Sequence, residues 1–291
     1  MTIAPPAPAL LSAERWRDRA EAHTARADAL TEAHRSRAAR GVKHPVEDFL
    51  FTYYSYKPSV LRRWHPGEGV DLADAAGTER TAWRWYASGA HPGSLAVDGE
   101  GLRARYGALL ANIGRILRAT AGRAANFGCL GLHEWAMVYR ATDRRHDVPL
   151  RLGQTATDAV VDAHDLRCTH FDAFRFFTPA AAPLNRVQPT REGQAAREQP
   201  GCLHAGMDLY KWAVKAGPLV PGEVMLDAFE LARDIRILDM RASPYDLTDW
   251  GYAAVPIETP DGKASYVRAQ REFSVRGQAI RARLLACIDP R

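Results

Sequence analysis

The sequence predicts a mainly α fold, in which a single globular helical domain carries a small β element. Most long segments place apolar residues three and four positions apart, which is the spacing of an amphipathic helix. Residues 65–100 differ, because two His-Pro-Gly turns flank a short aromatic run that is typical of a strand. No repeat period or composition break divides the chain. We therefore expect residues 12–291 to form one domain, and residues 1–11 to form a flexible tail.

The first helix is expected to run from Ser12, a suitable N-cap, to Arg40. Pro45 fits the first position of a second helix, whose positive end would face Glu47 and Asp48. The next stretch interleaves aromatic rings with cations: Tyr53, Tyr54, Tyr56, Lys57, Arg62, Arg63 and Trp64. Such a stretch can stack a base and hold its phosphate, or it can be a core edge with arginines that reach out to water.

The middle of the chain predicts two further helices and an irregular segment. Residues 102–122 have the stripe of an amphipathic helix, and residues 127–140 are apolar nearly all round, as in a central helix. Thr157 is expected to cap a short helix that ends at His164. Residues 178–201 are rich in Pro, Ala, Gln and Arg and read as a long loop, of the kind used as a lid or to grip a substrate.

Residues 168–177 have two possible readings. As a strand, they would place His170, Asp172 and Phe174 on one face. As a helix, they would place Asp172 over Phe176 and pair it with Arg175.

The C-terminal part is expected to hold three helices and a hairpin. Residues 203–215 carry an apolar stripe beside a polar stripe, and Pro221 opens a helix that ends at Arg241. Residues 252–266 read as a hairpin around Pro-Asp-Gly, followed by a last helix that packs through residues 266–284.

Composition limits the class of protein. The chain has 291 residues, of which 46% are hydrophobic and 25% charged, as in an ordinary globular protein. It has no run of about 20 apolar residues and no signal pattern, so we expect a cytoplasmic protein without a membrane segment. The four cysteines are scattered, as expected of reduced thiols. The net charge of +5 comes mainly from arginine, which suits a phosphate-bearing partner but also follows from GC-rich codon usage.

The common catalytic motifs are absent, since the chain lacks GxxxxGK[ST], GxSxG, HExxH and a GxGxxG that follows a strand. Instead, three acid–histidine pairs lie in apolar surroundings: His133/Glu134, His170/Asp172 and His204/Asp208. His170, Asp172 and His204 could form a facial triad for iron. Alternatively, a carboxylate could act without metal, by stabilising a sugar cation or activating water.

Five segments resemble a bacterial family of 3-methyladenine DNA glycosylases, and the likeness covers residues 12–289. They are HPVEDFLFTYYSYKPSVLRRWHPG, FGCLGLHEWAMVYR, RCTHFDAFRFFTPAAAPLN, QPGCLHAGMDLYKWA and ELARDIRILDMRASPYDLTDWGY. The chain lacks the Leu-Pro-Gly hairpin pattern of the helix-hairpin-helix glycosylases and the helical repeats of another class. The resemblance implies base excision. Our leading hypothesis is a monofunctional DNA glycosylase, for which we expect no cofactor, no metal and no obligate protein partner.

The base could be an alkylated purine, as the family name implies, or a bulky modified cytosine such as the glucosylated hydroxymethylcytosine of phage DNA. A cationic alkylated purine leaves easily and needs mainly a stacking pocket and one carboxylate. A neutral modified cytosine also needs a general acid, and its glucosyl group needs a roomy polar pocket. The histidine–acid pairs and tyrosines suit the second demand somewhat better.

On this interpretation a flipped nucleotide enters a pocket formed by the acid–histidine segments. We expect Asp172 to be the catalytic carboxylate, with Glu134 and Glu47 as the next candidates. The base pocket would comprise His170, Phe174, Tyr53, Tyr54, His133, His204 and Asp208. Phosphates would be held by Lys57, Arg62, Arg63, Arg144 and Arg145. The alternatives are a non-haem metal-dependent oxidoreductase using His170, Asp172 and His204, and a DNA-binding protein without catalysis.

Overall fold

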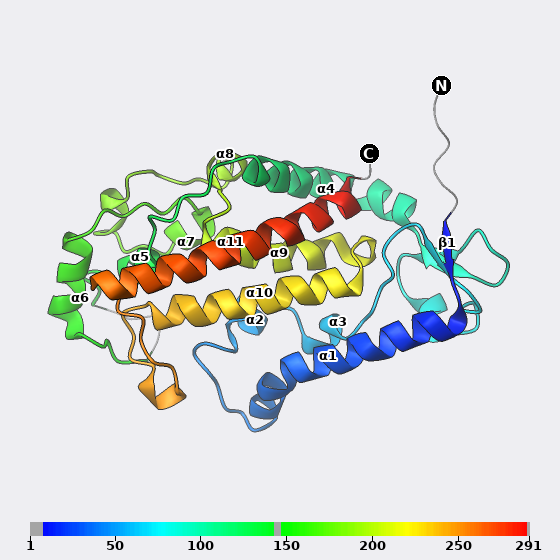
Figure 1. Ribbon diagram of the computed structural model, residues 1–291, viewed down its shortest axis with the longest axis horizontal. Helices are drawn as coiled ribbons and strands as arrows, with labels where there is room; N and C mark the ends of the chain where they lie inside the picture. The colour runs from blue at the N-terminus through cyan, green and yellow to red at the C-terminus, as the bar shows by residue number, and fades with distance from the viewer. Residues whose placement is uncertain (1–7, 143–146, 290–291) are drawn as a thin grey trace.

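Three long helices, packed side by side, form the body of the protein in the computed structural model, which describes residues 8–142 and 147–289 (Figure 1). They are α9 (Leu203–Ala216), α10 (Gly222–Arg241) and α11 (Pro260–Ile288). α1 (Ala13–Ala39) packs along α10, and α4 (Gly99–Ala121) packs against α11. The fold class predicted from the sequence, mainly α with a small β element, is confirmed.

Shorter elements cover this body. The helical ones are α2 (Phe49–Thr52), α3 (Pro58–Leu61), α5 (Leu132–Ala136), α6 (Gly153–Asp162), α7 (Phe171–Phe174) and α8 (Gln194–Arg197), with 3-10 turns at Glu79–Ala82, Ala182–Leu184, Gly217–Leu219 and Thr248–Trp250. The strands are β1 (Ala9–Leu11), β2 (Val70–Leu72), β3 (Tyr86–Ser88) and β4 (Leu95–Val97).

Local signals explain where the long helices begin. The Ser12 hydroxyl accepts a hydrogen bond from the amide of Arg15 and caps α1, as predicted. Thr259 caps α11 in the same way, with Pro260 at the first helical position. The rings of Tyr210 in α9 and Phe229 in α10 meet in the core, with centroids 5.2 Å apart, and Tyr266 of α11 is buried in the same core.

The strands form one sheet in the order β1-β2-β4-β3, at the end of the molecule opposite α6 (Figure 1). β1 pairs in parallel with β2, so that Ala9 lies opposite Val70. The prediction of a flexible tail over residues 1–11 is therefore wrong for Ala9–Leu11, because the edge of β2 supplies hydrogen-bond partners for this strand. Residues 1–7 lie outside the described part of the chain.

Four predicted elements differ from the structure. Residues 252–266 form no hairpin, because Thr259 and Pro260 start a helix where the Pro-Asp-Gly sequence suggested a turn. The predicted helix over 127–140 shrinks to α5, since Leu130 and Gly131 have φ of 52° and 73° and interrupt it.

Thr157 does not cap a helix, because α6 already begins at Gly153 and the Thr157 hydroxyl bonds back to the Gly153 carbonyl. The helix predicted at Pro45 starts later, at Phe49. Residues 45–48 instead form a turn in which the His44 ring accepts hydrogen bonds from two backbone amides.

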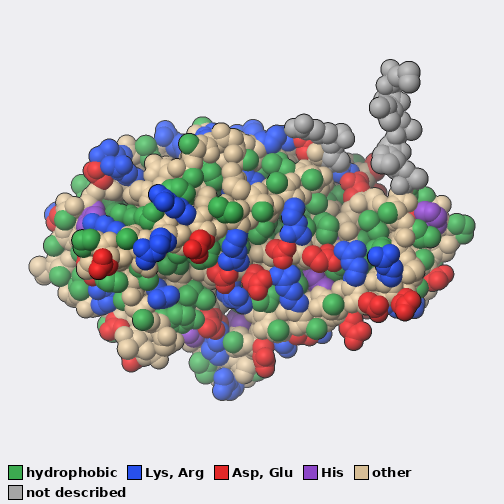
Figure 2. All heavy atoms as spheres, viewed as in Figure 1, with side chains coloured by type: hydrophobic (Ala, Val, Ile, Leu, Met, Phe, Trp, Pro, Cys, Tyr) green, Lys and Arg blue, Asp and Glu red, His purple; other side chains and the backbone are tan. Residues whose placement is uncertain are grey.

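Positive and negative side chains alternate over α1, α10 and α11 rather than forming a basic patch (Figure 2). Many of them are paired between helices: Arg26 with Asp227 and Glu230, Arg283 with Asp227, and Arg276 with Asp234. The positive net charge is therefore not concentrated on this face. No helix in the described part of the chain is both long and apolar enough to cross a bilayer.

Candidate functional site

A pocket of about 310 Å³ opens where α2, α5, α7, α9 and the C-terminal half of α10 meet. Both aromatic rings and charged or polar groups line it. Its lining residues are Phe49, Thr52, Tyr53, Tyr54, Glu134, Met137, His170, Asp172, Ala173, Phe176, His204, Asp208, Arg236 and Tyr245. The structure thus brings together seven of the residues proposed from the sequence: Tyr53, Tyr54, Glu134, His170, Asp172, His204 and Asp208.

The aromatic side is built from neighbouring turns of the chain. Phe49 and Tyr53 lie one helical turn apart, and their rings stack with centroids 4.9 Å apart and planes 9° from parallel. Phe176 meets Tyr53 edge-on at 6.5 Å. The Arg175 guanidinium lies 4.0 Å from the centre of the Phe176 ring. These rings offer flat apolar surface for a planar ligand.

Asp208 is the most enclosed acid of the pocket. It is 2% exposed, yet three donors satisfy its carboxylate: the hydroxyl of Tyr54 at 3.0 Å, Nε2 of His170 at 3.3 Å, and the ammonium of Lys211. Burial alone would raise the pKa of Asp208, but Lys211 and His170 outweigh it and lower the pKa. Asp208 is therefore an ionised acceptor whose two oxygens are both bonded by donors of the protein.

His170 links Asp208 to a second buried acid, Glu198, which comes from the loop that precedes α9. Nε2 of His170 lies 3.1 Å from Glu198 and 3.3 Å from Asp208. Burial would lower the pKa of His170, but the charge of Glu198 and the contact with Asp208 raise it to about 9. Gln194 donates to the same Glu198 oxygen at 2.6 Å. The group is thus a compensated network of two acids and two cations, one of which is Lys211.

Asp172 differs from the other pocket acids because it is accessible. It lies in α7, so the helical reading of residues 168–177 is the one observed, and its Oδ1 is 3.2 Å from Nε of Arg175. Arg191 and Lys211 approach it only to 3.6 Å. Within residues 8–142 and 147–289 no hydrogen bond reaches its side chain, which is 19% exposed.

The third pocket acid, Glu134, pairs with Arg236 at 3.1 Å. The same guanidinium lies 4.0 Å from the centre of the Phe49 ring, and both side chains of the pair are buried. Arg236 is held in place from both sides. Glu134 therefore faces the pocket as half of an ion pair.

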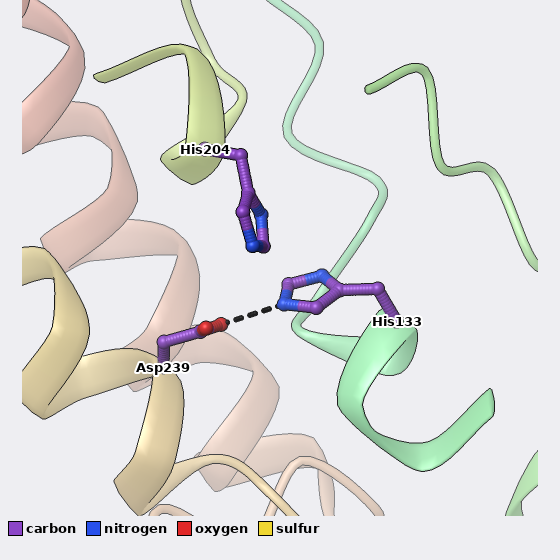
Figure 3. A group of neighbouring side chains, drawn as sticks. All are labelled: His133, His204 and Asp239. Carbon is purple, nitrogen blue, oxygen red and sulfur yellow. Dashed lines mark ion pairs between the residues drawn. The ribbon is translucent and has the colours of Figure 1, made fainter. Parts of the chain in front are cut away.

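A second layer of polar side chains lies behind the residues that line the pocket. In it, His133 from α5 faces Asp239 from α10 at 2.9 Å. His204 from α9 lies above them, and its ring points towards the gap between them (Figure 3). Burial would lower the pKa of His133, whereas the charge of Asp239 raises it and prevails. His204 is shared between the layers, because it also lines the pocket.

Several residues proposed from the sequence lie elsewhere. The carboxylate of Glu47 is held by Arg37 at 2.7 Å and by the hydroxyl of Tyr252 at 2.8 Å, outside the pocket. Phe174 packs on Phe177 and belongs to the core instead of the pocket lining. His133 is in the second layer.

The proposed phosphate contacts are also separate from the pocket. Arg62 pairs with Asp28 at 3.0 Å, and Arg63 lies over the Trp83 ring. Both line a different hollow, along α1. Lys57 is exposed just before α3. Arg144 and Arg145 lie outside the described residues.

The structure also adds residues that the sequence analysis did not select: Arg175, Arg191, Glu198, Lys211, Arg236 and Asp239. Asp239 left a signal, because it follows Ile235 by one turn and so falls on the apolar stripe of its helix. Glu198 left none, since it lies in an irregular segment.

His170, Asp172 and His204, the proposed iron triad, do not form a ligand group. Among the described residues the His and acid side chains that converge are instead His133 with His204 and Asp239, and His170 with Glu198 and Asp208. Asp172 is turned towards Arg175, Arg191 and Lys211.

Comparison of the chain with models of known protein families, with curated proteins and with solved structures gave no match. The pocket itself must therefore carry the argument for function.

Proposed function

We propose that this protein is a DNA glycosylase that binds a flipped, modified nucleotide in the pocket and hydrolyses its N-glycosidic bond. The observation that carries the proposal is the position of Asp172, an accessible carboxylate that faces a hollow walled by stacked rings. A pocket of this size, with a few convergent polar groups, suits a small planar ligand. The resemblance of the motifs around Asp172 to glycosylases supports the same conclusion.

The chemistry follows from the developing charge. As the bond between the base and C1′ breaks, the base leaves with the bonding electrons and takes up a proton from solvent, while positive charge develops on the sugar. Asp172 stabilises that charge and accepts a proton from the water that adds to C1′. The proton that the attacking water releases later returns to solvent, so the proton count balances. Asp208 and Glu134 cannot take this role as readily, because buried donors already occupy them.

The base would stack on the ring wall of Phe49, Tyr53 and Phe176. Phe176 and Phe49 thus replace Phe174 in the proposed base pocket. Polar groups that also line the pocket, among them His204 and Arg236, can bond to substituents on the base. This number of polar groups favours a bulky polar modification, such as a glucosylated hydroxymethylcytosine, over an alkylated purine.

The phosphates beside the flipped nucleotide would be held by Arg175 and Arg191, in place of Arg62 and Arg63. Arg191 is 66% exposed and lies 3.6 Å from Asp172, so it stands at the pocket mouth. Its guanidinium can exchange a distant carboxylate for a phosphate in a bidentate pair. Such an exchange would free Asp172 for the reaction.

The test is base release from DNA that carries different modified bases, scored as strand scission after alkali. Asp172→Asn should lower excision by at least about 100-fold and leave DNA affinity within a few fold. Asp227→Asn is the matched control, because Asp227 also pairs with arginines but does not line the pocket. Wild-type excision by Asp172→Asn would refute its role. Salt-sensitive binding without abasic sites on any substrate would identify a DNA-binding protein instead.

A further inference from the structure

The layer behind the pocket contains buried polar atoms of His133 and Asp239 that make no hydrogen bond to any described residue. Asp239 is 0% exposed and His133 is 3% exposed. Among the described residues, neither Nε2 of His133 nor either oxygen of Asp239 has a hydrogen-bond partner. Their 2.9 Å approach is close, but it is not aligned as a hydrogen bond. Burying a carboxylate without hydrogen bonds costs free energy of folding, so the lack of hydrogen bonds to Asp239 calls for an explanation.

The third member of this layer is His204, in the first turn of α9. Each of the three side chains offers one ligand atom, and these atoms lie within 4.8 Å of one another. Figure 3 shows that the three side chains come from separate elements and converge on one point. Two imidazole nitrogens and one carboxylate oxygen form a common ligand set for zinc or non-haem iron.

We propose that His133, His204 and Asp239 bind one divalent transition-metal ion, such as Zn²⁺, behind the wall of the pocket. Metal–ligand bonds of about 2.0–2.2 Å require the three ligand atoms, which lie within 4.8 Å of one another, to draw together around the ion. The ion would bond to the carboxylate of Asp239, which has no hydrogen bond within the described residues. Because His204 also lines the pocket, a fourth coordination position can face the space in which a ligand binds.

The neighbouring group of His170, Glu198 and Asp208 converges equally well but does not need an ion. Tyr54 and Lys211 donate to Asp208, and Gln194 donates to Glu198. His170 lies between the two acids and within reach of both. Every acid in that group accepts a hydrogen bond from the protein, whereas Asp239 has, among the described residues, only ion-pair contacts with His133 and Arg236. This contrast assigns the metal to the His133 layer.

Other groups around the proposed site are consistent with a cation. Arg236 is the nearest permanent positive charge, at 3.7 Å from Asp239, but Glu134 pairs with it at 3.1 Å. On the other side of His133, the Cys129 sulfur lies 3.6 Å from Nδ1 and orients the ring so that Nε2 faces Asp239.

The test uses the full-length chain, purified without a histidine tag, and requires no DNA. We expect close to one bound metal per chain by elemental analysis. After removal of the metal with a chelator, titration with Co²⁺ should produce visible absorption bands and raise the thermal midpoint. His204→Asn should weaken Co²⁺ binding by more than tenfold. It is the most suitable variant, because His204 is the least buried of the three ligands.

His170→Gln is the matched control, since His170 is also buried and its ring stacks on His204. This variant should keep the metal. If it loses the metal while His204→Asn retains it, the ion belongs to the other group and the assignment is wrong. If the wild-type chain binds neither Zn²⁺ nor Co²⁺, His133 and Asp239 form an ordinary ion pair and the proposal is overturned. Either result is independent of whether the protein excises bases.

Discussion

Replacing Lys211 by Met should strongly destabilise the protein, because it removes the cation beside Asp208. Asp208 is ionised and 2% exposed, and Lys211 is the only donor to it that carries a permanent charge among the described residues. Removing one partner of a buried ion pair costs about 3–5 kcal/mol, since the remaining charge stays buried. Tyr54 and His170 still contact Asp208 at 3.0 and 3.3 Å, so we expect the lower end, about 3 kcal/mol.

The measurement is the free energy of unfolding from urea titration at pH 7. A second substitution, Asp208→Asn, removes the stranded charge, so the double variant should recover about 2 kcal/mol relative to the sum of the single effects. Lys215→Met is the control: it lies one turn further along α9 and over the same Trp212 ring. It should cost less than about 0.5 kcal/mol. A loss below 1 kcal/mol for Lys211→Met, or strict additivity, would refute the reasoning.

Two further predictions concern regions remote from the pocket. Asp71 is buried and accepts hydrogen bonds from His91 and Ser94; burial opposes its ionisation, but these bonds lower its pKa. Its contribution should therefore be present above the ordinary Asp pKa of about 4 and lost as the pH falls further. Asp71→Asn should lower the free energy of unfolding by about 1–3 kcal/mol at pH 7 and by less below pH 4. The control is Asp18→Asn at an exposed position, which should change the free energy of unfolding little at either pH. A loss that does not depend on pH would contradict this account. Gly262→Ala should lower the free energy of unfolding by about 3 kcal/mol, because the new Cβ would lie 2.0 Å from the Pro256 carbonyl oxygen. Gly107→Ala, on an open face of α4, should raise the free energy of unfolding by about 0.5–1 kcal/mol. Equal effects in urea titration would show that the turn before α11 can relax.

The long helices could be predicted because their signals are local. Ser12 caps α1, and the stripes of α9 and α10 record which side of each helix is buried. The prediction of a hairpin was wrong because Thr-Pro-Asp-Gly can either start a helix or form a turn. The packing of α11 on α9 and α10 selects the helix. The predicted length of the helix around α5 was too great, because a positive φ at Leu130 cannot be inferred from composition.

The sequence by itself selected the segments that meet at the pocket, because acids and histidines within apolar stretches must find partners when they are buried. It could not decide who those partners are. Glu47 meets Tyr252, Asp208 meets Tyr54 and His170, and Asp239 meets His133, and each of these contacts joins segments far apart in the sequence. Whether a carboxylate is occupied by the fold, open to a ligand or left without a partner depends on distances between segments far apart in sequence. The tertiary structure alone sets those distances, and it leaves Asp172 open and Asp239 incomplete.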